Sequence, residues 1–283
     1  MKKYGIGNSM IMIVLITLTI VVCYPIIFII VGSLKSNGEL LRNLSPVFYE
    51  TEGYASWSLL PLEPTLRAYV ELLLDSPKFF VMFWNSVKIT MGILLGQVIV
   101  SVPAAWALAR YRFPCAKVIY ILYIVLMMLP FQVLMLSNYF VLEQLNLLDT
   151  LRGIILPSIF STFPIFIMKN AFTSVPEVLL ESGRLDGASE VQLFFSIGIP
   201  ISMPGIISMV MVGVIESWNM IEQPLNFLKD KTKWPLSLFL PAITIEGVRF
   251  AFVVAMIMLI PIMLLFFIGK KYLEEGIAMI TLK

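Results

Sequence analysis

The 283-residue chain is 59% hydrophobic and only 13% charged, with a formal net charge of +2. Because a soluble globular domain carries about 25% charged residues, this chain has too few to cover a water-facing surface. It contains no histidine and only two cysteines, which excludes His-dependent catalysis and Cys-rich zinc or iron–sulfur sites. The small net charge also argues against a nucleic-acid partner. The composition predicts an integral membrane protein, embedded in membrane lipid, that binds no metal or cofactor of its own.

Six charge-free runs divide the chain into candidate membrane spans, each close to the ~20 apolar residues that cross a hydrocarbon core. They cover residues 4–34, 89–109, 118–142, 153–168, 191–215 and 250–269. Lys169 can snorkel to the interface, which extends the fourth run to about Phe172. None of the runs alternates with a period of two, so we predict an all-α protein with six transmembrane helices.

Basic residues flank the spans on one side. They are Lys2, Lys3, Arg110, Arg112, Lys117, Lys270 and Lys271. The short connection 143–150 on the other side carries Glu143 and Asp149 but no basic residue. Because cytoplasmic loops are enriched in Lys and Arg, both termini are predicted to be cytoplasmic.

The spans and connections suggest three parts. Residues 1–35 form a cytoplasmic tip and the first transmembrane helix, and residues 36–80 form an extracytoplasmic segment with a short helix at 67–74. Residues 81–283 form a core transmembrane domain of five helices, with a cytoplasmic loop at 173–200 and a C-terminal tail at 270–283. Within this core, Gly92 and Gly96 are spaced to let two helices approach closely.

The 173–200 loop has the pattern of two short helices. Ser174–Glu177 and Ser189–Gln192 each match a capping box, and Asp186-Gly187 should end the first helix at about Leu185. The second helix is expected to end before Pro200. An apolar stripe along the first helix would suit either docking of a partner protein or packing against the chain's own bundle.

Residues 181–200 read E-S-G-R-L-D-G-A-S-E-V-Q-L-F-F-S-I-G-I-P. This segment resembles the E-A-A-x3-G-x9-I-x-L-P loop of permease subunits from binding-protein-dependent ABC importers. Glu181, Gly187, Ile197 and Pro200 fall at the matching positions. Ser182 and Gly183 replace the paired alanines and Ile199 replaces leucine, all small or apolar changes.

The resemblance extends along most of the chain and is strongest to the second permease of maltose-type carbohydrate transporters. The matching segments are Tyr24-Pro25, Gly32–Lys35, Tyr69 with Leu72 and Leu73, Asn85–Val87, Ala105–Tyr111 followed by Phe113, Ser217–Met220 and Pro224-Leu225. The tail from Glu275 to Lys283 resembles a C-terminal extension that reaches the ATPase in the family, although it ends differently from the usual glycine-rich form.

The resemblance implies the type I ABC importer permease fold in a bacterial inner (plasma) membrane. It also implies the partners: an ATPase dimer that binds ATP and Mg, a second and different permease, and an extracytoplasmic binding protein that delivers a sugar. The residues implied to couple to the ATPase are Glu181, Ser182, Gly183, Leu185, Asp186, Gly187 and Ala188. The chain itself has no G-x-x-x-x-G-K-[ST] motif, so it is expected to be a transport subunit and not an enzyme.

Three residues near the end of the fifth span could contact substrate. Glu216 would face a pathway or make a structural hydrogen bond within the bundle. Trp218 and Asn219 offer an aromatic face and an amide, which suit a sugar, but they equally suit a membrane-interface belt and a helix end.

Other functions predict different residues. An importer for glycerol phosphate should place basic residues inside the spans, where only Lys88, Lys169 and Arg249 lie at the edges. An intramembrane enzyme needs catalytic Asp pairs or a His dyad, and no aspartate lies in any charge-free run. An ATP-independent channel or carrier would need no coupling loop.

Overall fold

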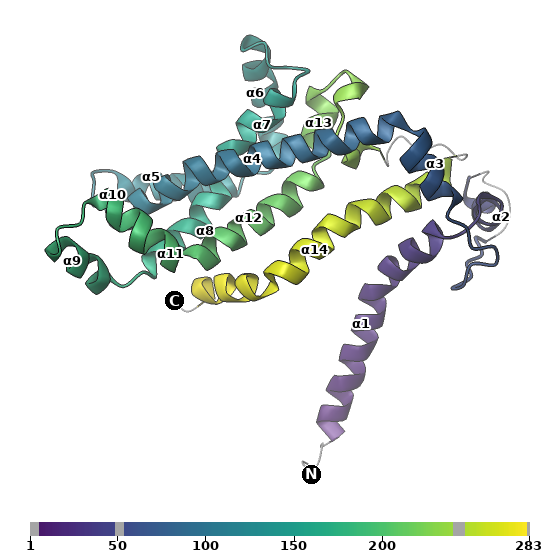
Figure 1. Cartoon of the computed structure of the whole chain (residues 1–283), viewed down its shortest axis with the longest axis horizontal. Helices are drawn as coiled ribbons and strands as arrows, with labels where there is room; N and C mark the ends of the chain where they lie inside the picture. The colour runs from purple at the N-terminus through teal and green to yellow at the C-terminus, as the bar shows by residue number, and fades with distance from the viewer. Residues whose placement is uncertain (1–5, 49–53, 240–246, 282–283) are drawn as a thin grey trace. The chain divides into compact units, whose positions relative to one another are not determined.

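The computed structural model describes residues 6–48, 54–239 and 247–281, and these residues form helices and connecting loops without a β-strand (Figure 1). The α-helices are α1 Ile6–Ser33, α2 Asn37–Phe48, α3 Arg67–Asp75, α4 Pro77–Arg110, α5 Ala116–Met127, α6 Phe131–Gln144, α7 Leu151–Ile159, α8 Thr162–Thr173, α9 Glu177–Leu185, α10 Glu190–Leu193, α11 Ile199–Ile201, α12 Met203–Trp218, α13 Glu222–Phe227 and α14 Val248–Thr281. The predicted all-α class is confirmed. The short helix expected at 67–74 is α3, whereas α2 was not predicted.

The chain folds into two compact units. The first unit comprises residues 1–79 and 239–260, and the second comprises residues 80–238 and 261–283. Each unit is therefore built from two separate stretches of the chain, and α14 begins in the first unit and continues into the second. The three-part division expected from the sequence stays a prediction.

Among the described residues, four helical segments are long and apolar enough to span a membrane, one of them being α7 and α8 together, and up to six spans result if each of two bent helix pairs counts as one. The predicted third span is not a straight helix, since α5 and α6 meet at 104°. Pro130 causes this break, because it has no N–H to donate and adopts an extended conformation as the N-cap of α6. The predicted fifth span is also bent, by 70° between residues 190–201 and 203–218.

In the first unit, the connection after α1 is held by a buried ion pair. Lys35 Nζ lies 3.2 Å from Glu39 Oε1, and both side chains are almost fully buried. The same ammonium lies 3.9 Å from the ring centroid of Trp57 and donates to Ser58 Oγ at 2.9 Å. Burial acts to raise the pKa of Glu39, but hydrogen bonds from Lys35 and from the backbone hold it below its usual value.

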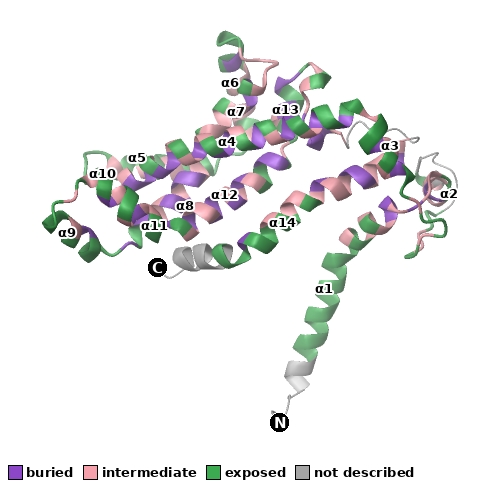
Figure 2. Cartoon of the chain, in the orientation of Figure 1, coloured by how far each residue is buried: buried purple, intermediate pink, exposed green. Residues whose placement is uncertain are grey.

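α1 itself has no buried face in the most apolar part of its length. Figure 2 shows it exposed almost throughout, and none of its most hydrophobic stretch in Met10–Ser33 is buried. An apolar helix of this kind must be covered by lipid or by another protein chain.

In the second unit, small residues let the helices approach closely. A Cβ added to Gly92 or Gly96 of α4 would lie 2.9 Å and 2.3 Å from side-chain atoms of Ile155 and Ile159 in α7. This agrees with the close packing expected from the four-residue spacing. At Gly205 of α12, an added Cβ would lie 2.4 Å from the Cβ of Ala171 in α8.

Two loops of the second unit are joined through Asp149. Its Oδ1 accepts the backbone N–H of Lys229 and of Asp230, at 3.0 and 2.9 Å. Lys233 Nζ lies 3.0 Å from Oδ2. The backbone hydrogen bond from Asp230, followed by that from Lys233, lowers the pKa of Asp149. The loop therefore stays anchored unless the pH falls low enough to protonate this carboxylate.

The α8–α12 crossing generates a stability prediction. Gly205→Ala should lower the free energy of unfolding by about 1–3 kcal/mol, because the Cβ of Ala171 cannot move unless its helix moves. Thermal unfolding in detergent would measure the change. Gly38→Ala in α2 is the matched control, since nothing lies within 4 Å of its added methyl group. Equal melting temperatures for the two variants would show that the helices do not cross this closely.

Candidate functional site

The first helix of the 173–200 loop is α9, which ends at Leu185 as predicted but begins at Glu177, later than the expected start after Ser174. The capping box predicted at Ser174 is wrong: Pro176 is the N-cap, without a side-chain hydrogen bond. Ser174 Oγ instead donates to the carbonyl of Ala171, at the end of α8. The turn after α9 depends on Gly187, whose φ of +83° favours glycine.

The second helix begins with the predicted capping box. Ser189 Oγ accepts the N–H of Gln192 at 3.3 Å, and Gln192 Oε1 accepts the N–H of Ser189 at 2.8 Å. The expected stop before Pro200 is wrong, because a π-helical turn at Phe194–Gly198 carries the chain into α11, which contains Pro200. π-helical turns of this kind frequently occur at functional sites.

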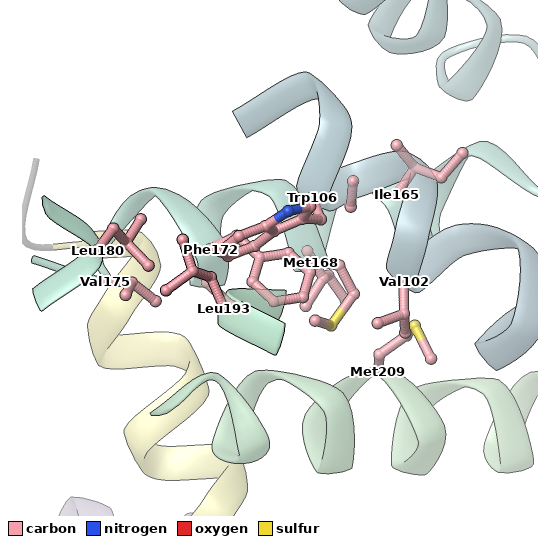
Figure 3. Close-up of a cluster of buried hydrophobic side chains, with 12 residues drawn as sticks. Val102, Trp106, Ile165, Met168, Phe172, Val175, Leu180, Leu193 and Met209 are labelled. Atoms are coloured by element: carbon pink, nitrogen blue, oxygen red, sulfur yellow. The ribbon is translucent and has the colours of Figure 1, made fainter. Parts of the chain in front are cut away.

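One face of α9 is anchored in a hydrophobic core. Leu180 is fully buried and belongs to a cluster with Trp106 from α4, Phe172 from α8 and Leu193 from α10 (Figure 3). The Trp106 and Phe172 rings meet edge to face, with centroids 5.2 Å apart. Burying side chains of this size stabilises the attachment of α9 to this core by about 1.5–3 kcal/mol each.

The other face of α9 carries large apolar side chains that the chain itself does not cover. Leu185 is 89% exposed, Val178 72% and Leu179 42%. We call residues 177–188 the elbow. One face of α9 therefore packs against the bundle, and the other is exposed in the part of the chain that the structure describes.

The residues singled out from the resemblance all lie on the elbow. Glu181, Ser182, Leu185, Asp186 and Gly187 are exposed, whereas Gly183 and Ala188 are half-buried. Gly183 lies against α10, because a Cβ there would be 2.6 Å from Leu193 Cδ2. A hollow of about 370 Å³ opens beside it, with Asp186 and Ile197 among its lining residues.

A network of charged side chains, which the sequence reasoning missed, fixes the elbow to the end of α4. Arg110 is 92% buried, donates to the carbonyls of Phe172 and Val175, and pairs with Glu177 at 2.9 Å. Glu177 also pairs with Arg184 at 3.2 Å. One guanidinium therefore holds the chain on both sides of the α8–α9 connection.

The network continues to the second helix of the loop. Arg184 Nε lies 2.8 Å from Glu190 Oε1, and Tyr111 Oη donates to Glu190 Oε2 at 3.2 Å. The hydrogen bond to Glu190, followed by that to Glu177, raises the pKa of the Arg184 guanidinium. Because Arg184 is exposed, its ion pairs contribute little to the free energy of folding. Their main effect is to fix the position of α9 relative to α10.

The three candidate pathway residues at the end of α12 differ in accessibility. Glu216 and Asn219 are exposed, and Asn219 Nδ2 donates to the carbonyl of Ile215 at 2.9 Å. Trp218 is only 5% exposed and meets Phe83 edge to face, with centroids 6.0 Å apart. In this conformation Glu216 and Asn219 are accessible to a ligand, whereas the Trp218 ring is buried against Phe83.

Arg110 provides a direct test of the elbow. Arg110→Lys should speed amide exchange in residues 174–190 by about tenfold or more, because an ammonium cannot serve two carbonyls and a carboxylate with the planar geometry of a guanidinium. Hydrogen–deuterium exchange of the purified protein would measure this. Arg112→Lys is the matched control, since Arg112 is exposed on the same connection. Unchanged exchange in the Arg110 variant would contradict the anchoring role.

Comparisons with known proteins find relatives along most of the chain. The arabinooligosaccharides transport system permease protein AraQ of Halalkalibacterium halodurans is 26% identical over 90% of this chain and 88% of its own length. The probable ABC transporter permease protein PH1036 of Pyrococcus horikoshii is 30% identical over 84% and 88%. The sn-glycerol-3-phosphate transport system permease protein UgpE of Brucella suis is 27% identical over 81% and 79%.

A solved structure has the same fold. It is a bacterial ABC transporter involved in the import of the acidic polysaccharide alginate, with a TM-score of 0.79 and 22% identity over 96% of this chain and 99% of that one. Residues 97–279, which contain the elbow and α12, match one family over well over half of the chain. The chain therefore belongs to the family of binding-protein-dependent transport system inner membrane components, the permeases of ABC importers.

Proposed function

We propose that this chain is the permease subunit of an ATP-driven importer for a neutral oligosaccharide, in which it forms half of the translocation pathway. Family membership makes it a multi-pass inner-membrane component that is not catalytic and binds no cofactor itself. ATP hydrolysis therefore belongs to a partner ATPase, and an importer of this family also works with a binding protein.

The observation that carries the proposal is the two-faced elbow. Leu180 and Arg110 fix one side of α9 to the bundle, while Leu185 and Val178 project from the other. An exposed apolar patch on a rigid support is typical of a protein-docking surface. A rigid contact can transmit movement of the ATPase to α8 and α12, which flank the elbow and cross closely.

The charges near the spans favour a neutral substrate over an anion such as glycerol phosphate. Lys169 Nζ lies over the ring of Tyr120, 3.7 Å from the ring centroid. Glu216 adds an exposed negative charge at the end of α12. A pathway with a carboxylate would repel an anion, whereas Asn219 can hydrogen-bond sugar hydroxyls.

We further propose a second, different permease as the other half of the pathway, and both termini in the cytoplasm. The membrane orientation rests on the basic residues near the elbow side, including Arg112 and Lys117. The likeness of the chain to AraQ proteins supports the carbohydrate substrate. Insertion of the C-terminal tail into the ATPase would add a second contact to that made by the elbow.

Docking at the elbow can be tested with one substitution. Leu185→Asp should abolish co-purification of the ATPase from native membranes, because it places a charge where an apolar side chain is desolvated. Mass spectrometry would identify the proteins that remain. Leu145→Asp is the matched control, since Leu145 is also exposed but lies beyond α6. Retention of the ATPase by the Leu185 variant would contradict docking at this face.

Substrate contact can be tested at Asn219. Asn219→Ala should raise the KM for sugar uptake about three- to tenfold, the effect of losing one hydrogen bond, while the ATPase still co-purifies. Uptake by reconstituted vesicles would measure it. Asn226→Ala is the control, because the Asn226 amide also donates to a carbonyl four residues earlier. An equal KM for the two variants would remove Asn219 from the pathway.

A further inference from the structure

We propose that the first unit holds the phosphate of an anionic phospholipid in a cavity at the ends of the first and last spans. The cavity measures about 450 Å³ and is lined by residues of the first unit that include Lys35, Asn37, Glu63, Thr65, Arg67 and Arg249. Asn37, Arg67 and Arg249 lie at the starts of α2, α3 and α14, and the other three lie in the connections before α2 and α3 (Figure 1). None of the lining residues belongs to the elbow or to α12.

Two arginines in the cavity wall are held by one carboxylate. Arg67 Nε lies 2.7 Å from Glu71 Oε1, and Arg249 Nη2 lies 2.7 Å from Glu71 Oε2. Because Glu71 carries a single charge, the trio keeps a net charge of +1. The charge of Glu63, which also lines the cavity, is offset by Arg42 at 3.7 Å. Arg249 Nε is buried and has no hydrogen-bond partner among the residues that the structure describes. Two guanidiniums held at a fixed spacing suit recognition of a phosphate.

The backbone adds to the positive potential. The N-terminus of an α-helix carries a partial positive charge, so cations in the first turn are unfavourable and anions are favourable. Arg67 and Arg249 occupy the first turns of α3 and α14, and neither turn contains an acidic residue. The N-cap of α3 also makes no side-chain hydrogen bond to the helix. A bound anion would offset the unfavourable interaction between these arginines and the positive helix N-termini.

The position of the cavity identifies the membrane as the source of the anion. Lys35 follows the end of α1 and Arg249 lies in the first turn of α14, so the cavity lies where two candidate spans, Met10–Ser33 and Val248–Tyr272, reach the interface. Lipid phosphates occupy this depth. The exposed apolar surface of α1 offers a path for the acyl chains of the same lipid.

The test is lipid retention by the assembled importer, measured by native mass spectrometry after purification in a mild detergent. With phosphatidylglycerol and phosphatidylcholine supplied together, the wild type should retain phosphatidylglycerol preferentially. Arg67→Gln, Arg249→Gln should reduce that retention about tenfold or more, since charge-assisted hydrogen bonds are lost. Arg152→Gln is the matched control, because Arg152 is an exposed arginine in the first turn of α7 and does not line the cavity.

A variant with the opposite expected effect separates binding from folding. Glu71→Gln keeps the shape of the side chain and removes the charge that competes with the lipid, so phosphatidylglycerol retention should rise. The proposal would be overturned if phosphatidylglycerol retention fell in both the Glu71 variant and the double arginine variant. It would also be overturned if the double arginine variant retained as much phosphatidylglycerol as the Arg152 control. Displacement of the lipid by excess inorganic phosphate would also overturn it, in favour of a soluble anion.

Discussion

The side chain of Arg110 is the constraint on which the candidate site depends. It lies at the last residue of α4, is almost completely buried, and binds two carbonyls and one carboxylate around the α8–α9 connection. Burying a guanidinium is costly unless its donors are satisfied, so the contacts of Nη1 and Nη2 hold the connection in one geometry, whereas the buried Nε has no hydrogen-bond partner among the described residues. The Phe172 carbonyl, in the last turn of α8, also accepts the backbone N–H of Val175 at 3.2 Å, so two donors meet at this helix end.

With that geometry fixed, the remaining features of the elbow act together. Leu180 reaches the core that Trp106 and Phe172 provide, so the face bearing Leu185 must point away from the bundle. On the far side of the elbow, the π-helical turn and the bend before α12 return the chain to cross α8 at Gly205. A force applied to the elbow would therefore reach two helices through close, stiff contacts.

The sequence predicted those parts of the structure that depend on local chemistry. The Ser189 capping box, the turn at Gly187 and the end of α9 follow from neighbouring residues, and all three are confirmed. Ser174 shows the limit of this reasoning, because it matches the same capping pattern but bonds to the end of the preceding helix.

Features that depend on distant residues were not predictable in the same way. A run of apolar residues indicates a span but not its bends, so hydropathy alone does not report the 104° turn at Pro130 or the π-helical turn. The Arg110 network joins residues more than sixty positions apart, and no spacing rule connects them. An arginine at the end of an apolar run, with acidic residues in the next loop on the same side, is the signal that could have indicated it.

The most direct test of the central claim is site-specific crosslinking from position 185 in the assembled importer. Cys23 and Cys115 are exposed and would first be replaced by serine, after which Leu185→Cys carries a photoreactive probe. The account predicts a crosslink to the ATPase from position 185 and none from Leu145→Cys. A probe at position 185 that reacts only with lipid, or with this chain itself, would contradict the proposal that the elbow binds the ATPase.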